Sequence, residues 1–433
     1  MEQEISALQH AMARLDDPTA LIPPVVKYYA ASRIYSAVES CFAHWENIPE
    51  ISNAELYFDY LNALEDVEDR RGFLLATQSY LARLKNAHTH FIDFTLLQNS
   101  GFGFWARPLP VSASKHAWTV CGSTRTDIKA GDIIEQVNNL PANEFFAGYT
   151  KLVSASKPEA AARNLLLFNS FLLPNQLNIT LHEGQSLQIT RAGHEHPLSL
   201  LKAFELSTSE KHPRLIIRSF SKPEFEEQAL SFLSQLDDHS PLILDLRGNG
   251  GGNTPRKLMQ KLYLEPIPVC RESTPQVIGL EKAEQGVAAW QNGELSAHHN
   301  QPNAETTPMR LLTKDETFPA SATPFRGELI ILIDVGSGSA TEDLLIPLKH
   351  SGRATIVGEA SAGSTGQPYF EAPLPKTQLT ISAKRAGFPD GTRFEGVGIQ
   401  PDYPVMPTPE DIRHGNDPAL TLAQQLLRQM VSS

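Results

Sequence analysis

The stretch that decides the fold is Glu328-Leu-Ile-Ile-Leu-Ile-Asp-Val-Gly-Ser-Gly-Ser-Ala-Thr-Glu-Asp343, which continues into Leu344-Leu-Ile-Pro-Leu-Lys349. Its continuous apolar run is typical of a strand buried on both faces of a sheet. The small-residue turn that follows leads into a helical pattern, with Ser339 near the expected helix N-terminus. Unpaired backbone N–H groups and the helix dipole can stabilise an alkoxide or an oxyanion there. The simpler interpretation is that Ser337, Ser339 or Thr341 only caps the helix.

A second apolar run ends in a loop rich in glycine, Leu242-Ile-Leu-Asp-Leu-Arg-Gly-Asn-Gly-Gly-Gly252. Three successive glycines permit positive φ angles and a close approach of backbone amides to a ligand. The loop is therefore suited to holding an oxyanion, although a tight strand-to-helix turn would also explain it. Further buried strands are expected at Leu215–Phe220 and Thr355–Val357, so the sequence predicts an α/β core over residues 206–433.

Two other units are predicted before this core. Residues 1–98 have apolar residues at three- and four-residue steps and should form a helical domain that ends at the His88 motif. Residues 99–205 contain short β-like runs, and Ile128-Lys-Ala-Gly-Asp-Ile-Ile-Glu-Gln-Val-Asn-Asn-Leu-Pro141 resembles the carboxy half of a PDZ domain. A plain strand between two Gly/Asn turns is the alternative. Residues 265–324, rich in Pro, Gln and Asn, are interpreted as an insertion or lid-like segment.

Composition excludes several classes of function. The 433 residues carry a formal net charge of −12, which argues against a nucleic-acid partner. Three widely spaced cysteines suggest neither a disulfide framework nor a zinc site, and no phosphate-binding loop is present, so we expect no cofactor and no metal. The acidic start and the absence of a long apolar run predict a cytoplasmic protein if Met1 is the native start, and a periplasmic or exported one if a signal peptide has been removed.

Three motifs in fixed order carry a family resemblance. D-L-R-G-N-G-G-G at residues 245–252, G-S-G-S-A-T-E-D at 336–343 and G-R-A-T-I-V-G-E at 352–359 resemble the catalytic domain of the C-terminal processing, or tail-specific, serine peptidases. The resemblance implies a ClpP/crotonase-like α/β core. It is strong over the last half of the chain, moderate over the PDZ-like region, and confined to the closing motif of the helical region. It implies that Ser339, the second serine of S-x-S-A-x-E, is the nucleophile.

One departure from the family pattern bears on the general base. Many members have a G-K-G turn whose lysine is the base, but here the turn is Ala360-Ser-Ala-Gly-Ser-Thr-Gly366, with Ser364 at the lysine position. The chain resembles instead the branch of the tricorn protease core and the interphotoreceptor retinoid-binding protein repeats. In tricorn-like enzymes a histidine in a motif that aligns with residues 86–90 is the base, which implies His88, with His90 as the competitor. An imidazole titrates near neutral pH and suits this role.

The same branch suggests the other site residues. A glutamate shortly before a G-[VI]-x-P-D stretch orients the catalytic group, and Phe394-Glu-Gly-Val-Gly-Ile-Gln-Pro-Asp402 makes Glu395 the candidate; a surface carboxylate before a turn is the alternative. The oxyanion hole is expected to use the backbone N–H of Ala340 and that of Gly251 or Gly252. Further polar residues of these motifs are interpreted as braces or helix-dipole partners without a chemical role: Asp245, Arg247, Asn249 and Glu342.

The predicted function is hydrolysis of peptide bonds in peptides or protein C-terminal tails. Ser339 would attack the carbonyl, His88 would carry the proton, and an acyl-enzyme would form. The PDZ-like region could capture a free C-terminus by strand addition. A peptide or an unfolded protein is the expected partner, and a homo-oligomer is possible. The alternative is a non-catalytic protein of the same fold that binds peptides or small hydrophobic ligands, as the retinoid-binding relatives illustrate.

Overall fold

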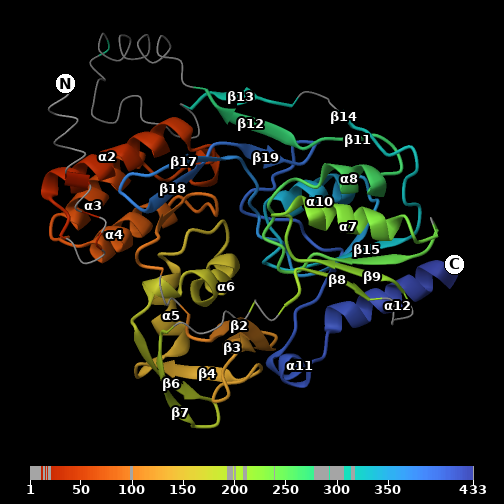
Figure 1. Ribbon diagram of the computed structural model, residues 1–433, viewed down its shortest axis with the longest axis horizontal. Coiled ribbons are helices and arrows are strands. Elements are labelled where there is room, and N and C mark those ends of the chain that lie inside the picture. Colours follow the sequence, from red (N-terminus) through yellow and green to blue (C-terminus); the bar gives the residue numbers. More distant parts are fainter. Residues whose placement is uncertain are drawn as a thin grey trace.

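The computed structural model describes residues 21–97, 101–192, 201–207, 212–237, 239–276, 307–313 and 317–432, together with 11–12, 15, 17, 198 and 292. Three units are arranged side by side (Figure 1). A helical unit and an α/β unit lie at opposite ends, and a β-rich unit lies below them in the view. Among the described residues, no helix has both the length and the apolar character needed to cross a membrane.

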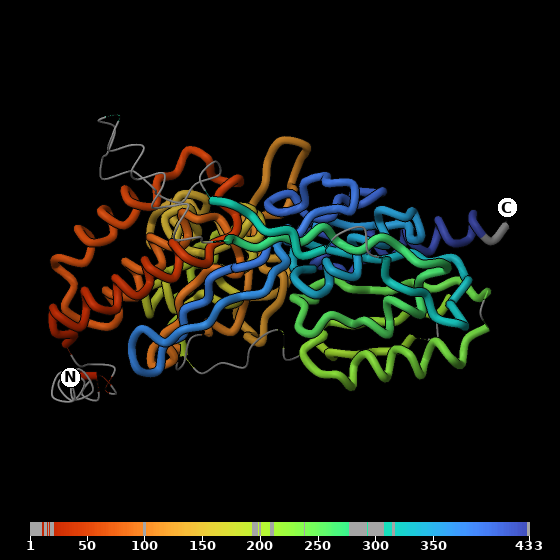
Figure 2. The backbone as a smooth tube through the Cα atoms, turned by 90° about the horizontal axis from the view of Figure 1, so that it is seen from above, coloured from red at the N-terminus to blue at the C-terminus, as the bar shows by residue number. Residues whose placement is uncertain are grey.

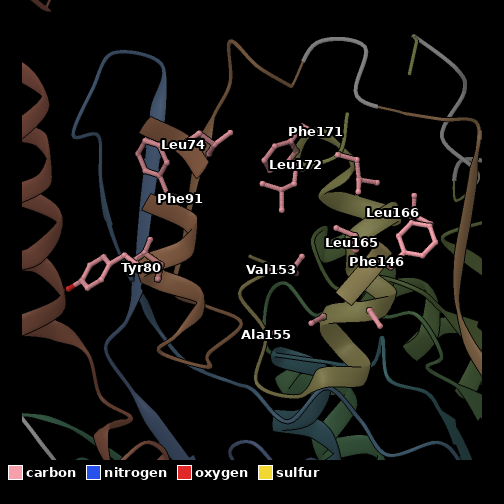
Figure 3. Close-up of a cluster of buried hydrophobic side chains, with 14 of the residues drawn as sticks. Leu74, Tyr80, Phe91, Phe146, Val153, Ala155, Leu165, Leu166, Phe171 and Leu172 are labelled. Carbon is pink, nitrogen blue, oxygen red and sulfur yellow. The ribbon is translucent and has the colours of Figure 1, made fainter. Parts of the chain in front are cut away.

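The helical unit forms because three amphipathic helices bury one face each. The helices are α2 (Pro24–Cys41), α3 (Asn53–Leu64) and α4 (Arg70–Ala82). Ser52 caps α3 by accepting a hydrogen bond from the Glu55 N–H at 3.4 Å, and Asp69 caps α4 by accepting from the Gly72 N–H at 2.7 Å. Figure 3 shows Leu74, Tyr80 and Phe91 on one side of the resulting core and side chains of the β-rich unit on the other, so the two units share one hydrophobic core.

A strand pair from the far end of the chain completes the helical unit. The short strand β1 (His90–Asp93) pairs antiparallel with β18 (Thr377–Ser382), which pairs in turn with β17 (Pro368–Glu371). In Figure 2 this hairpin, drawn in blue, runs alongside the red N-terminal helices. His90 is opposite Thr380 in the register. The segment that carries the predicted histidines is therefore held by residues nearly 290 positions later.

The β-rich unit contains a six-stranded antiparallel arrangement with two helices. Its elements are β2 (Phe104–Ser112), β3 (Lys115–Ser123), β4 (Ile133–Val137), β5 (Leu140–Pro141), α5 (Ala142–Thr150), α6 (Pro158–Phe168), η3 (Ser170–Leu172), β6 (Gln176–Leu181) and β7 (Ser186–Thr190). Asn138 and Asn139 join β4 to β5 with φ angles of 50° and 66°. Asparagine tolerates this left-handed conformation, so the expected strand and N-N turn of the PDZ-like motif are present.

The α/β unit confirms the predicted buried core. Its sheet has the order β20-β16-β15-β10-β9-β8, and all neighbours are parallel except β8 and β9. The strands are β8 (Phe204–Ser207), β9 (Arg214–Ile217), β10 (Leu242–Asp245), β15 (Leu329–Ile333), β16 (Thr355–Gly358) and β20 (Tyr403–Pro404).

Helices cover both faces of this sheet, which explains the continuous apolar strands. They are α7 (Pro223–Leu233), α8 (Arg256–Leu262), α10 (Ala340–His350) and α12 (Pro418–Ser432). The short helix α11 (Pro409–His414) packs instead against β2 and β3 of the β-rich unit. Alternate residues of β15 point to opposite sides: Ile331 packs in the cluster with the α7, α8 and α10 side chains, and Ile330 packs with those of α12. Figure 1 shows α12 on the other side of the sheet from α10.

Residues 265–324 were predicted to be an insertion, and their middle, apart from residue 292, lies outside the described residues. The flanks form two short antiparallel ladders, with β11 (Ile267–Pro268) on β14 (Thr317–Phe318), and β12 (Arg271–Pro275) on β13 (Met309–Leu311). The strand β12 also pairs with β19 (Arg385–Gly387). The ribbon β13-β12-β19 therefore crosses the molecule next to the end of the hairpin that holds β1.

Candidate active site

Ser339 occupies the sharp corner between β15 and α10. Its φ and ψ angles are 56° and −127°, a conformation that costs a non-glycine residue on the order of 1–3 kcal/mol. The corner is held by two hydrogen bonds from the Ser339 N–H, one to the Ser364 carbonyl at 2.9 Å and one to Glu342 Oε2 at 3.1 Å. The serine side chain is thus fixed at a helix N-terminus, where orphan N–H groups concentrate.

His88 reaches this serine from the helical unit. Its Nε2 lies 3.2 Å from Ser339 Oγ, and its Nδ1 lies 2.9 Å from Ser364 Oγ. The Asn86 side chain positions the turn by accepting a hydrogen bond from the His88 N–H at 2.9 Å. If the ring proton is on Nδ1 and is donated to Ser364, Nε2 is free to accept the hydroxyl proton of Ser339. That is the geometry a general base needs.

Burial and a neighbouring ring keep the imidazole neutral. Removal from water is the main cause, and the His90 imidazole adds to it, so the pKa of His88 is lowered from its ordinary value to about 4. The charge of Asp343 acts in the opposite direction. His88 is therefore in its proton-accepting form throughout the neutral pH range.

The competing histidine does not contact the serine. His90 Nδ1 lies 3.0 Å from Thr380 Oγ1 on β18 and 3.3 Å from the carbonyl of Ala87. These contacts fasten the start of β1 to the C-terminal hairpin. His90 thus has a structural position behind His88.

Glu395 does not lie where the resemblance suggested. The Nδ1 partner of His88 is Ser364, whereas Glu395 Oε1 accepts a hydrogen bond from the Thr365 N–H at 3.3 Å, and Oε2 lies 3.9 Å from Nδ1 of the buried His44. Burial holds the pKa of Glu395 well above its ordinary range, with the nearby Glu342 adding to the effect. The turn 360–366 thus places Ser364, rather than Glu395, within hydrogen-bond distance of His88 Nδ1. The expectation that this carboxylate orients the catalytic imidazole is therefore corrected.

Glu342 has a larger role than the sequence suggested, because it ties the two serine-bearing turns together. Its carboxylate accepts hydrogen bonds from the N–H groups of Ser339, Gly363 and Ser364, at 3.1, 2.7 and 3.1 Å, and from the Ser361 hydroxyl. Burial raises the pKa of Glu342 to about 7, and these donors oppose the shift. The signal in the sequence was a carboxylate three residues after the nucleophile, a position from which it can reach back to the N-cap backbone.

The predicted oxyanion donors lie around the same corner. Ala340 is the first residue of α10, and among the described residues its N–H has no hydrogen-bond acceptor. Gly251 is in direct contact: a Cβ on it would lie 2.6 Å from Ser339 Cβ and 2.7 Å from the Ala340 nitrogen. The Gly251 N–H, however, donates to Asn249 Oδ1 at 2.9 Å, whereas no acceptor for the Gly252 N–H is found in the described part of the chain. This favours Gly252 over Gly251 as the second donor.

The residues expected to brace the glycine loop do so. Asp245 accepts hydrogen bonds from Arg214 at 2.6 Å and from Arg247 at 2.7 and 2.9 Å, and Arg247 also binds Asp417. These guanidinium groups hold the pKa of Asp245 below its ordinary range despite its burial. The buried Asn249 donates to the Ile217 carbonyl at 3.0 Å. None of them touches Ser339.

A cavity of about 260 Å³ opens beside the first turns of α10. Asp343 lies in its wall and accepts hydrogen bonds from Thr254 and Thr365, each at 2.7 Å. The opposite wall carries Lys384, paired with Glu272 at 2.5 Å. The remaining lining combines the apolar Met259, Val269, Cys270, Phe318 and Pro347 with the polar Arg256, Thr313 and Gln367. No group of three metal-ligating side chains occurs among the residues described.

The β-rich unit is fastened to the loops of the site. Arg107 on β2 makes a two-pronged ion pair with Glu359, which follows β16, with both contacts at 2.6 Å. Lys157, just before α6, donates to the carbonyls of Ala360 and Ser361. The turn that carries Ser364 is thus held from the β-rich side as well.

Comparisons with known proteins concern mainly the α/β unit. Residues 215–405 match the sequence model described as Peptidase family S41. A carboxy-terminal-processing protease of Bartonella bacilliformis is 37% identical over 102 residues, which cover 23% of this chain and 23% of that protein. An uncharacterized protein of Chlamydia muridarum is 24% identical over 156 residues, or 35% of this chain and 24% of that protein. The matched stretches thus span about a quarter of these curated relatives.

Several solved structures resemble nearly the whole chain. Mature CPAF complexed with lactacystin has a TM-score of 0.64 over 94% of this chain and 99% of that one, at 13% identity. At that identity the likeness concerns the fold, and it supports the predicted α/β core with its helical and β-rich units. Residues 215–405, which include Ser339 and most of the α/β unit, are therefore similar to the domain of peptidase family S41.

Proposed function

We propose that this chain is a serine peptidase that hydrolyses peptide bonds in peptides or in the C-terminal tails of proteins. The observation that carries the proposal is the 3.2 Å separation between His88 Nε2 and Ser339 Oγ, contributed by residues 251 positions apart. A hydroxyl beside a neutral imidazole at a helix N-terminus is the arrangement that nucleophilic acyl transfer requires.

The proposed reaction has two steps. Ser339 Oγ attacks the substrate carbonyl while His88 Nε2 takes the hydroxyl proton, and the N–H groups of Ala340 and Gly252 stabilise the oxyanion. His88 then returns the proton to the leaving amine, which gives an acyl-enzyme. Water, activated by the same imidazole, releases the acyl group and regenerates the serine.

The third member of this site is proposed to be Ser364 rather than a carboxylate. It accepts the Nδ1 proton of His88 at 2.9 Å and so fixes the tautomer in which Nε2 is the base. A neutral hydroxyl gives less electrostatic support to the developing imidazolium than a carboxylate would. We infer that the chain uses a Ser-His-Ser arrangement within the branch of the family that lacks the catalytic lysine.

We also propose that the β-rich unit presents the substrate tail. The fold supports this through its PDZ-like strand and turn pattern, because an extended peptide can add to such a sheet as a further strand. The contacts of Arg107 and Lys157 with residues 359–361 keep that unit next to the turn that carries Ser364. A captured tail would therefore have a short path to the serine.

Labelling with a fluorescent fluorophosphonate tests the proposal, with the adduct located by mass spectrometry. We expect native protein to be labelled at Ser339 and the Ser339→Ala variant to remain unlabelled. Ser351→Ala is the matched control, because Ser351 is an exposed serine at the other end of α10 and should leave labelling unchanged. Folded native protein that gains no adduct would instead favour a binding protein of the same fold.

A further inference from the structure

A second pocket lies behind the ribbon formed by β12 and β19. It has a volume of about 400 Å³, and the residues 391–395 close one side of it. Three guanidinium groups line it, those of Arg271, Arg385 and Arg393, and the hydroxyl-bearing Ser273 and Thr392 lie between them. This is a concentration of positive charge on a chain whose net charge is −12.

The carboxylates near this pocket neutralise only part of its positive charge. Glu46 pairs with Arg385 at 2.6 Å and is partly exposed at the rim. Glu395 is buried, and burial holds its pKa well above the ordinary range, which disfavours its negative charge. Arg393 uses Nε to hold the Glu395 carbonyl at 3.1 Å. Within the part of the chain that the structure describes, Arg271 has no carboxylate at ion-pair distance.

Arg271 is exposed, and its side chain lies against the turn at Gly391. A Cβ on Gly391 would lie 3.2 Å from Arg271 Nη1, so the glycine leaves room for the guanidinium to lie against the turn. The backbone of Arg271 is fixed by its pairing with Gly387 on β19. An exposed guanidinium on a fixed backbone, without a carboxylate partner among the described residues, can pair with an incoming anion.

The ribbon separates this pocket from the cavity beside α10. Because side chains alternate along a strand, Glu272 and Lys384 face the cavity beside α10, whereas Arg271, Ser273 and Arg385 face the opposite side. The two cavities therefore share strands but present different chemistry. Neither Ser339 nor His88 lines the pocket behind the ribbon.

We propose that the pocket behind β12 and β19 is an anion site that binds an oxyanion group, either a carboxylate or a phosphate, with Arg271 as its principal contact. The planar guanidinium matches both oxyanions in a two-pronged geometry. The volume exceeds that of the bare anion and leaves room for the molecule that carries it. Binding should weaken as ionic strength increases, because the site is open to solvent.

Calorimetric titration of the full chain tests this proposal with three probes: inorganic phosphate, N-acetylglycine and the neutral N-acetylglycinamide. We expect one or both anions to bind and the amide not to bind. Binding of phosphate alone identifies a phosphate source, and binding of acetylglycine identifies a carboxylate source. Arg271→Gln should weaken binding about tenfold, the size expected for one charge-assisted hydrogen bond.

Arg310→Gln is the matched control, because Arg310 is an exposed arginine on the adjacent strand β13 that does not line the pocket. It should bind the anions as the native chain does. Arg271→Lys, which keeps the charge but loses the fork, should fall between native protein and Arg271→Gln. The proposal is overturned if neither anion binds at about 10 mM, a concentration that detects weak sites. It is equally overturned if Arg271→Gln and Arg310→Gln bind alike.

Discussion

Two buried or half-buried histidines, His88 and His44, lie near each other, and each faces a different partner: His88 faces Ser339, and His44 faces Glu395. His88 is half-buried, and each of its ring nitrogens has a serine hydroxyl as partner. His44 is fully buried: Nε2 lies 2.8 Å from Ser382 Oγ, and Nδ1 faces Glu395 across 3.9 Å. Burial lowers the pKa of His88 to about 4 and that of His44 to about 3. A neutral imidazole is therefore common to both, and only the group beside it differs.

The difference teaches that a shifted pKa alone does not identify a catalytic residue. His88 faces a hydroxyl held in a strained corner next to orphan amides, so taking up a proton can drive a reaction. His44 faces a carboxyl group whose pKa is held well above its ordinary range, in a space closed to substrate. Its shift is the result of packing between the helical unit and the C-terminal hairpin.

The largest expected effect on labelling comes from removing the His88 imidazole, whereas removing that of His44 should have little effect on labelling. His88→Ala should lower the second-order rate of fluorophosphonate labelling at Ser339 by about 10³-fold, within the range for loss of a general base. His44→Ala should leave the rate per folded molecule within about threefold but lower the free energy of unfolding by about 2 kcal/mol, as expected for loss of a buried side chain. Labelling kinetics and thermal unfolding measure both. Equal rate losses in the two variants would contradict the distinction.

Gly251→Ala should disturb the site by steric overlap with Ser339. The new Cβ would lie 2.6 Å from Ser339 Cβ. The backbone φ angle at this position is 93°, which residues with a side chain rarely adopt. We expect labelling to fall about 10²-fold, comparable with loss of an oxyanion donor. Gly250→Ala is the control, because nothing lies within 4 Å of its added Cβ. The two glycines are neighbours, so similar rates for both variants would show that contact with Ser339 is unimportant.

Ser364→Ala tests the partner of the imidazole. Removing the hydroxyl leaves His88 Nδ1 without its acceptor, so the ring can rotate or change tautomer. The labelling rate should fall about tenfold, the value of one hydrogen bond of about 1.4 kcal/mol. Ser364→Thr should recover part of the rate if the hydroxyl can still reach Nδ1. A rate unchanged by Ser364→Ala would remove this serine from the site.

The smallest effect on the candidate site is expected from Glu395→Gln, which changes the pH dependence of stability. Because the folded pKa of Glu395 is raised, the protonated carboxyl is favoured in the native state, and its contribution is complete below the unfolded pKa. That contribution is lost as pH rises toward the folded pKa. Glutamine removes this dependence. Native protein should therefore lose more stability than the variant between pH 5 and 9, by at most about 1.4 kcal/mol per pH unit, in denaturant titrations. Parallel curves would contradict the assignment.

The sequence predicted the parts of the site that reside in local motifs. The buried strand, the small-residue turn and the helix after it place Ser339 within one continuous segment, and His88 followed from a short motif. The roles of Ser364 and Glu342 were missed, because they depend on how the turn 360–366 folds back onto α10. Hydrogen bonds between separate turns have no periodicity that a sequence could display.

The fold, like the site, could be predicted where it depends on local sequence patterns. Continuous apolar runs identified β10 and β15 because strands covered on both faces leave a strong compositional signal. The pairing of β1 with β18 was not predicted, since β1 has only four residues and its partner is in the last quarter of the chain. That single pairing helps to bring His88 to Ser339, so the part of the fold most important to the candidate site was the least visible in the sequence.

The pairing of β1 with β18 also sets the order of events during synthesis. A ribosome produces the helical unit first, but the strand that fixes His90, and with it the neighbouring His88, is made only when residues 377–382 emerge. Until then the His88 imidazole has no fixed position, even after Ser339 has been made. Under the proposed function, the pair of His88 and Ser339 is therefore assembled only once nearly the whole polypeptide has been completed.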